Sequence, residues 1–90
     1  MRTEMVGQRL REIRETLGLT LRDVETQSRH IAEARQNIDY LFSAGRLSQV
    51  ENSNSTPSLY KLATLSEIYH LHYGELLRLY GVEVSALASA

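Results

Sequence analysis

The sequence lacks several features that mark common classes of protein. Its 90 residues contain no cysteine, one proline and one phenylalanine, and their charges nearly balance at a net −1. Without cysteine, the chain cannot form disulfides or thiolate metal sites. It has no run of 18 apolar residues, which a membrane-spanning helix would need. Its N-terminus also lacks the apolar region of a secretory signal. We therefore expect a single cytoplasmic domain with no membrane segment.

Motifs for catalysis and for cofactor binding are missing as well. The sequence has no glycine-rich phosphate loop, no nucleophile–base pattern and no paired carboxylates. His70 and His72 are two positions apart and would lie on different faces of a helix, and His30 is distant in sequence. We therefore expect no enzyme activity, no metal and no cofactor. The near-neutral charge gives no overall attraction to nucleic acid, so DNA binding would need a local surface.

The sequence does contain a series of short helical patterns. The first apolar stripe has the spacing i, i+4, i+7, i+11 and consists of Val6, Leu10, Ile13 and Leu17. Gly18 then suits the left-handed end of a helix, so we predict a helix over about residues 4–17. Thr20, with Asp23 three positions later, forms a capping-box pattern that starts a second helix at Leu21.

No glycine or proline marks the end of the second helix in the sequence. We predict that its last residue lies somewhere between Ser28 and Arg35. Further on, the apolar residues Ile38, Tyr40 and Phe42 occupy every second position. A period of two favours an extended return segment. A helix that continues to Phe42 is the competing interpretation.

A third and a fourth helix follow. Ser43 can cap a short helix that Leu47 and Val50 anchor to the core. The polar stretch ENSNSTPS is a loop. At its end, Thr56 is predicted to cap the fourth helix, with Pro57 as the first helical residue.

The fourth helix is predicted over about residues 57–70 and the fifth over about 73–80, with Gly81 ending it. Residues 82–90 are small and weakly patterned, and we expect a tail or the start of a linker to a further domain beyond Ala90. The predicted inward residues of the last two helices are Leu59, Leu62, Leu65, Ile68 or Tyr69, Leu76, Leu77 and Tyr80.

A family resemblance is carried by three segments in order: LREIRETLGLTLRDVE, SAGRLSQVEN and TPSLYKLATLSEIYHLHYGELL. Together they resemble the XRE-like helix-turn-helix domain of phage repressors and Cro-type proteins. The resemblance implies a compact, all-α, five-helix, lambda-repressor-like DNA-binding domain over residues 1–81, with an insertion at about residues 29–42. It also implies a transcriptional regulator that binds double-stranded DNA as a homodimer on a two-fold operator.

In this family the second helix of the motif enters the DNA major groove, so the resemblance makes residues 44–52 the recognition helix. Ala44, Gly45 and Gln49 would reach base edges. Gln49 can pair with adenine, and Arg46 can pair with guanine or a phosphate. Ala44 and Gly45 have no hydrogen-bonding side chain. The predicted DNA-contacting residues are Thr20, Arg22, Ser43, Ala44, Gly45, Arg46, Ser48, Gln49, Asn52, Asn54 and Lys61.

Some motif residues also have structural roles. Thr20 and Ser43 are helix caps with or without DNA. Arg14 resembles a family arginine that pairs with the glutamate at the end of the recognition helix, here Glu51. That pair would lock the recognition helix to the first helix.

The insertion separates the two helices of the motif. The family places the small residue near the end of the supporting helix three positions before the next cap, whereas Ser28 and Ser43 are fifteen apart. If the extra residues all extended the helix, its tip would move by about 18 Å and the recognition helix would lose its core contacts. We favour a helix that ends at about Arg35, a turn at residues 36–37 and a return over residues 38–42.

This inserted arm, residues 29–42, carries Arg29, His30 and Arg35. Three roles are possible for the arm: a contact with the DNA backbone, a contact with a dimer partner, or no binding role. The alternative function for the whole chain is a protein-interaction module on the same helical scaffold that does not read DNA. The near-neutral charge, the small residues at the start of the recognition helix and the insertion favour that alternative.

Overall fold

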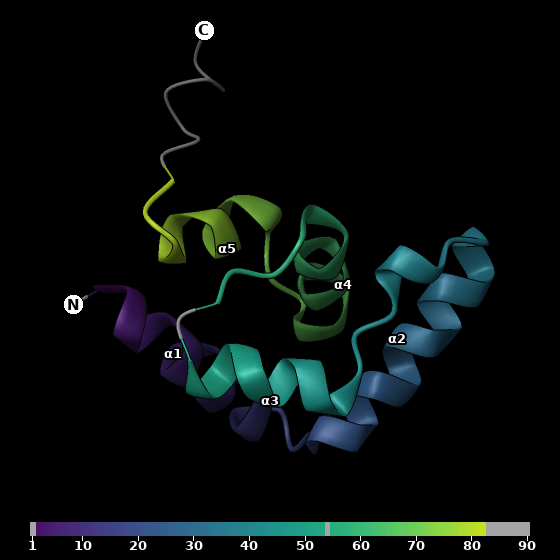
Figure 1. Ribbon diagram of the computed structural model, residues 1–90, viewed down its shortest axis with the longest axis horizontal. Coiled ribbons are helices and arrows are strands. Elements are labelled where there is room, and N and C mark those ends of the chain that lie inside the picture. The colour runs from purple at the N-terminus through teal and green to yellow at the C-terminus, as the bar shows by residue number, and fades with distance from the viewer. Residues whose placement is uncertain (1, 54, 83–90) are drawn as a thin grey trace, which may run out of the picture.

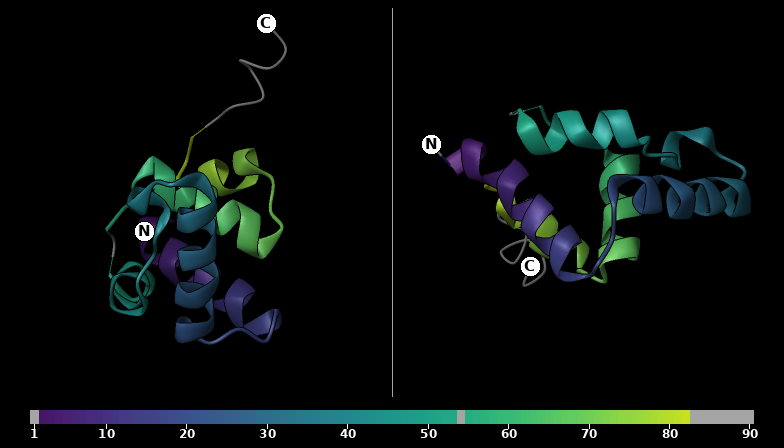
Figure 2. Two further views of the ribbon diagram at one scale, coloured as in Figure 1. Left: turned by 90° about the vertical axis from the view of Figure 1, so that its right-hand side faces the viewer. Right: turned by 90° about the horizontal axis from the view of Figure 1, so that it is seen from below.

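The computed structural model describes residues 2–53 and 55–82, and all regular elements in this part of the chain are helices. In Figures 1 and 2, α3 lies across α1, and the second half of α2 extends to one side with η1. The predicted all-α class with five short α-helices is confirmed for the described residues, and residues 83–90 of the predicted tail lie outside them. The elements are α1 (Arg2–Thr16), α2 (Leu21–Arg35), the 3₁₀-helix η1 (Ile38–Tyr40), α3 (Ala44–Asn52), α4 (Leu59–Tyr69) and α5 (Tyr73–Leu79).

Local capping determines where α1 ends and α2 begins. α1 ends at Thr16, and Gly18 takes a left-handed conformation with φ of 74°. The Thr20 hydroxyl accepts a hydrogen bond from the Asp23 N–H at 3.0 Å, and the Asp23 carboxylate accepts one from the Thr20 N–H at 2.9 Å. This reciprocal pair is the predicted capping box, and it satisfies backbone donors that a helix start leaves without partners.

The start of α4 differs from the prediction. Its N-cap is Ser58, whose hydroxyl accepts a hydrogen bond from the Lys61 N–H at 3.3 Å. Thr56 is therefore not the cap, and Pro57 lies before the helix, where it is buried. A serine hydroxyl caps as well as a threonine hydroxyl, so the sequence pattern fits either start. Because α4 begins two residues late, Leu59 lies on its first turn and is 68% exposed rather than buried.

The core forms where the five α-helices meet, and α3 is anchored to it by Leu47 and Val50, as predicted. Only Leu76 of α5 is fully enclosed, because this helix has just seven residues; Leu77 and Tyr80 are partly buried. Leu17 follows the end of α1 and is exposed. The buried apolar residues of the core are Val6, Leu10, Val24, Phe42, Leu47, Val50, Leu65, Ile68, Tyr69 and Leu76.

The inserted arm folds back on itself. α2 ends at Arg35 and Gln36 takes a left-handed conformation with φ of 53°, so the favoured prediction for the end of α2 and its turn is confirmed. The return segment is not extended from its start, because the Asn37 side chain accepts a hydrogen bond from the Asp39 N–H at 2.9 Å and caps η1. The chain is extended only after η1, where it inserts Phe42 into the core.

Gly7 allows α1 and α3 to approach each other closely. A Cβ atom at this position would lie 2.5 Å from the Glu51 carbonyl oxygen and 2.6 Å from that of Val50. Such distances are well inside van der Waals contact, so only glycine fits here without displacing backbone. The sequence analysis missed this contact because a glycine within a helical pattern does not indicate which backbone will lie against it.

Candidate nucleic-acid interface

The outer side of α3 is polar and carries no exposed acid. Ser43 caps this helix by accepting a hydrogen bond from the Arg46 N–H at 3.1 Å. Leu47, Val50 and Glu51 are buried, so the helix has one inward and one outward side. The outward side holds the predicted base-reading and groove-lining residues, which are Ala44, Gly45, Arg46, Ser48, Gln49 and Asn52.

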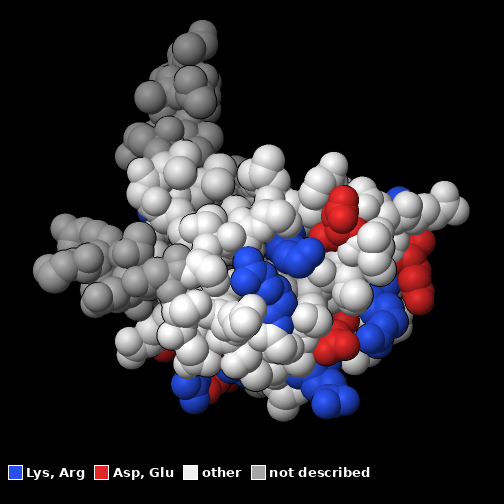
Figure 3. Space-filling model, viewed as in Figure 1, with Lys and Arg blue, Asp and Glu red and all other residues white. Residues whose placement is uncertain are grey.

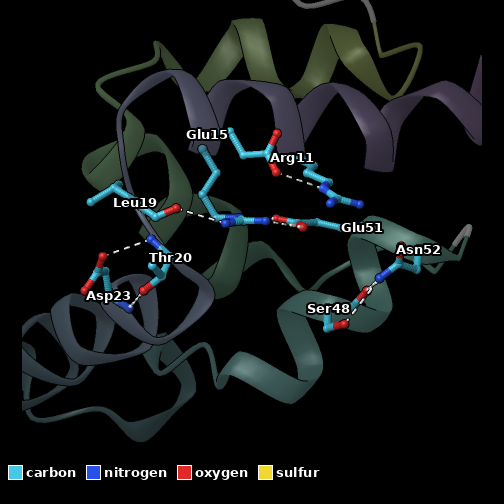
Figure 4. Close-up of polar contacts among 9 residues, drawn as sticks. Arg11, Glu15, Leu19, Thr20, Asp23, Ser48, Glu51 and Asn52 are labelled. Atoms are coloured by element: carbon cyan, nitrogen blue, oxygen red, sulfur yellow. Dashed lines mark hydrogen bonds and ion pairs between the residues drawn. The ribbon is translucent and has the colours of Figure 1, made fainter.

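A shallow hollow runs along this outward side and continues into the following loop. Within it, the Arg46 guanidinium donates a hydrogen bond to the Gln49 side-chain oxygen at 3.3 Å. The Asn52 amide donates to the Ser48 carbonyl oxygen at 2.8 Å, so this side chain is directed back along its own helix (Figure 4). The residues that line the hollow are Arg46, Ser48, Gln49, Asn52, Ser53 and Ser55.

A buried ion pair holds the C-terminal end of α3 against α1 (Figure 4). The Arg14 guanidinium donates to both carboxylate oxygens of Glu51, at 2.8 and 3.0 Å, and to the Leu19 carbonyl oxygen at 2.9 Å. The hydrogen bond to Glu51 raises the pKa of Arg14, although burial acts in the opposite direction. The predicted pairing of these two residues is confirmed. It removes the only acid of α3 from the surface.

The N-terminal end of α3 is held by a residue that the sequence analysis did not select. One carboxylate oxygen of Glu25 accepts a hydrogen bond from the Ala44 N–H at 2.8 Å, and the other accepts one from Arg29 at 3.0 Å. The Ala44 hydrogen bond is the main reason that the pKa of Glu25 is lowered, and the positive charges of Arg29 and Arg22 contribute. The Glu25–Arg29 spacing of four predicts their ion pair, but nothing in the sequence links Glu25 to a residue 19 positions away.

The base of the inserted arm is closed by Ser28. Its hydroxyl accepts a hydrogen bond from the Phe42 N–H at 2.9 Å and lies 2.7 Å from the Glu25 carbonyl oxygen, to which it can donate. Ser28 is fully buried, so these contacts satisfy polar groups inside the protein. The returning chain therefore meets α2 again at Ser28, seven residues before that helix ends, and Ser43 caps the start of α3 beside α2.

The outer part of the arm is bound to α4. The Tyr40 carbonyl oxygen accepts a hydrogen bond from Thr64 at 2.6 Å, and the Tyr40 ring contacts the Tyr60 ring edge to face with centroids 5.2 Å apart. Arg35 forms an ion pair with Glu67 at 2.6 Å and lies over the Tyr40 ring. These contacts pack the outer part of the arm against α4.

The remaining predicted site residues are divided between two places. Thr20 and Arg22 are exposed at the start of α2, where the Thr20 hydroxyl is engaged as a cap. Lys61 donates to the Asp39 carbonyl oxygen at 3.1 Å, which ties its ammonium group to the arm. Asn54 lies outside the described residues. Figure 3 shows Lys and Arg side chains near the middle of the face on which α3 lies and also along its lower and right-hand edges, where acidic side chains lie among them.

No protein-family model, curated protein or solved structure matches this chain at a significant level. The family resemblance of its motif therefore stays a prediction. None of the helices within residues 2–53 and 55–82 has both the length and the apolar character that a membrane span requires. The same residues contain no cluster of three or more histidine, aspartate or glutamate side chains arranged to hold a metal ion.

Proposed function

We propose that this protein is a transcriptional regulator with a lambda-repressor-like domain, which binds double-stranded DNA with α3 in the major groove. The observation that carries this proposal is the charge distribution of α3. Its only acid, Glu51, is buried against Arg14, and its outward side presents Arg46 and uncharged polar groups. A phosphate-bordered groove would meet no exposed carboxylate of α3 when this helix enters it.

The dimensions of α3 suit such a groove. An α-helix with its side chains is about 10–12 Å in diameter, and the major groove is about 12 Å wide, enough to admit a helix such as α3. In this orientation Gln49 pairs with adenine, and Arg46 pairs with guanine or with a phosphate. Ala44 and Gly45 add no bulk at the start of the helix, so the backbone approaches the base edges closely. We also propose that two copies bind a two-fold operator with half-sites about one helical turn apart.

The test is a binding assay by fluorescence anisotropy on a library of genomic fragments, at salt concentrations from about 50 mM upward. Because each phosphate contact releases condensed counterions, affinity should fall steeply with salt. Gln49→Ala should reduce the preference among sequences, whereas Arg22→Ala should weaken binding to all of them by a similar factor. Gln27→Ala removes an exposed glutamine of α2 and serves as the control. Absence of binding at about 50 mM salt would refute the proposal.

One observation favours a protein-interaction module as the second candidate function. Three large apolar side chains are exposed near the contact between the arm and α4: Ile38 is 72% exposed, Leu59 68% and Tyr60 44%. Exposed apolar groups that lie close together are typical of protein-binding surfaces. If this surface alone is functional, Ile38→Ser should abolish partner binding while Gln49→Ala changes nothing.

A further inference from the structure

Two arginines flank Glu25 on the same side of α2. Arg22, Glu25 and Arg29 have the spacing i, i+3, i+7, which places them on one helical face. Arg22 is exposed, and the side chain of Arg29 is 50% exposed. The face they form is therefore available to a partner along two turns of α2.

Glu25 connects this face to the N-terminal end of α3. It accepts a hydrogen bond from the Ala44 N–H with one oxygen and from Arg29 with the other. The Glu25 carboxylate thus bridges the Arg29 guanidinium and the backbone of Ala44, the first residue of α3. A guanidinium has five N–H donors, and the bond to Glu25 uses one of them, so Arg29 retains donors for an external oxygen.

The charges at this end of α3 sum to a positive value. The single carboxylate of Glu25 is accompanied by the guanidinium groups of Arg22 and Arg29, and both positive charges act on it. The N-terminus of α3 adds the partial positive charge of the helix dipole. An anion that approaches the start of α3 therefore meets a net attraction, although Glu25 itself is negative.

We propose that Arg22 and Arg29 together form a phosphate clamp that grips the DNA strand beside the groove that α3 enters. The two residues are separated by about 10.5 Å along α2, at 1.5 Å per residue. Measured along the axis of the duplex, at 3.4 Å per nucleotide of one strand, this distance spans about three nucleotides. Glu25 is the positioning residue, because it fixes both the start of α3 and the Arg29 side chain.

This inference rests on the proposed function and gives the insertion a role in it. In an unbroken motif α2 would end near Ser28, so Arg29 would not be on this helical face. The insertion thus extends α2 past Ser28 and carries a second arginine, and the closed base of the arm keeps the start of α3 beside that helix.

The experiment compares Arg29→Ala with Arg35→Ala, a matched control on the same arm. Arg35 has the same charge, but it is engaged with Glu67 on α4 and with the Tyr40 ring on η1. Binding is measured by fluorescence anisotropy on a duplex selected from the genomic library and on a shuffled duplex of equal length. Salt is varied from about 50 to 200 mM, the range over which phosphate contacts change affinity strongly.

For Arg29→Ala we expect weaker binding to both duplexes by the same factor and a slope of log affinity against log salt that is smaller by about one. Over a fourfold increase in salt, this variant should lose about 3.5-fold less affinity than the unaltered protein. Arg29→Lys keeps the charge and should retain most of the slope. Arg35→Ala should keep the original slope.

Three outcomes contradict the inference in distinguishable ways. If the unaltered protein binds neither duplex, the proposed function fails and the clamp fails with it. If the protein binds DNA and Arg29→Ala keeps the original slope, the clamp alone is wrong. If both arginine variants lower the slope equally, the effect comes from the overall charge and the clamp is also wrong.

Discussion

Replacing Gly7 by alanine tests the close approach of α1 and α3. The new Cβ atom would lie 2.5 Å from the Glu51 carbonyl oxygen and 2.6 Å from the Val50 carbonyl oxygen. Both are backbone atoms, so a side-chain rotation cannot relieve the overlap. The two helices would have to move apart, which would also displace the neighbouring Arg14–Glu51 pair.

The expected magnitude combines two opposing effects. Alanine in a helix interior is favoured over glycine by about 1 kcal/mol, whereas overpacking of a tight contact costs about 1–3 kcal/mol. We therefore expect Gly7→Ala to lower the free energy of unfolding by up to about 2 kcal/mol. For a domain of this size, each 1 kcal/mol lowers the melting temperature by about 4–8 °C.

Gly45 provides the control, because it is also helical and a Cβ atom there would meet nothing within 4 Å. Gly45→Ala should raise the free energy of unfolding by about 0.5–1 kcal/mol. Thermal and urea unfolding followed by circular dichroism measures both variants. If Gly7→Ala is as stable as Gly45→Ala, the backbones of α1 and α3 are not in contact and the reasoning is wrong.

Three further predictions concern the inserted arm and the two ends of α3. Phe42→Ala should cost about 3–5 kcal/mol in urea unfolding because this side chain is fully buried. Ile38→Ala should change stability by less than about 0.5 kcal/mol, because Ile38 is 72% exposed; equal losses would contradict the closed arm. Glu51→Ala should cost about 3–5 kcal/mol because it leaves Arg14 buried without its partner. Adding Arg14→Met should recover part of that loss, and no recovery would show that charge burial is not the cause. The pKa of Glu25 is lowered in the folded state, so its contribution to stability is present above its unfolded pKa of 4.5 and is lost as the pH falls through the folded pKa. Between about pH 6 and pH 3, the melting temperature should therefore fall less for Glu25→Gln than for the unaltered protein, and parallel curves would exclude the Ala44 contact.

The end of α2 shows how far sequence reasoning reached. The turn after Arg35 was predicted because a longer helix would have carried α3 away from its core, and the structure confirms it. The predicted extended return was wrong for residues 38–40, because a local side-chain cap overrides the period-two pattern there. Asn37 creates η1, and it leaves Ile38 exposed while Phe42 is buried. Periodicity describes which residues alternate, but it does not tell which of them reaches the core.

Some features of this protein follow from the sequence alone, because they depend on neighbours within about four positions. The five α-helices, the capping box at Thr20 and the inward side of α3 are of this kind. The contacts that position α3 depend on the tertiary structure, because their partners are far apart in the chain. Glu25 meets Ala44 across 19 residues, and Gly7 meets the carbonyl groups of α3 across more than 40. Only folding brings these atoms together. In the folded protein, the Glu25 carboxylate on α2 and the close approach at Gly7 on α1 fix the position of α3 and therefore the direction of its outward side.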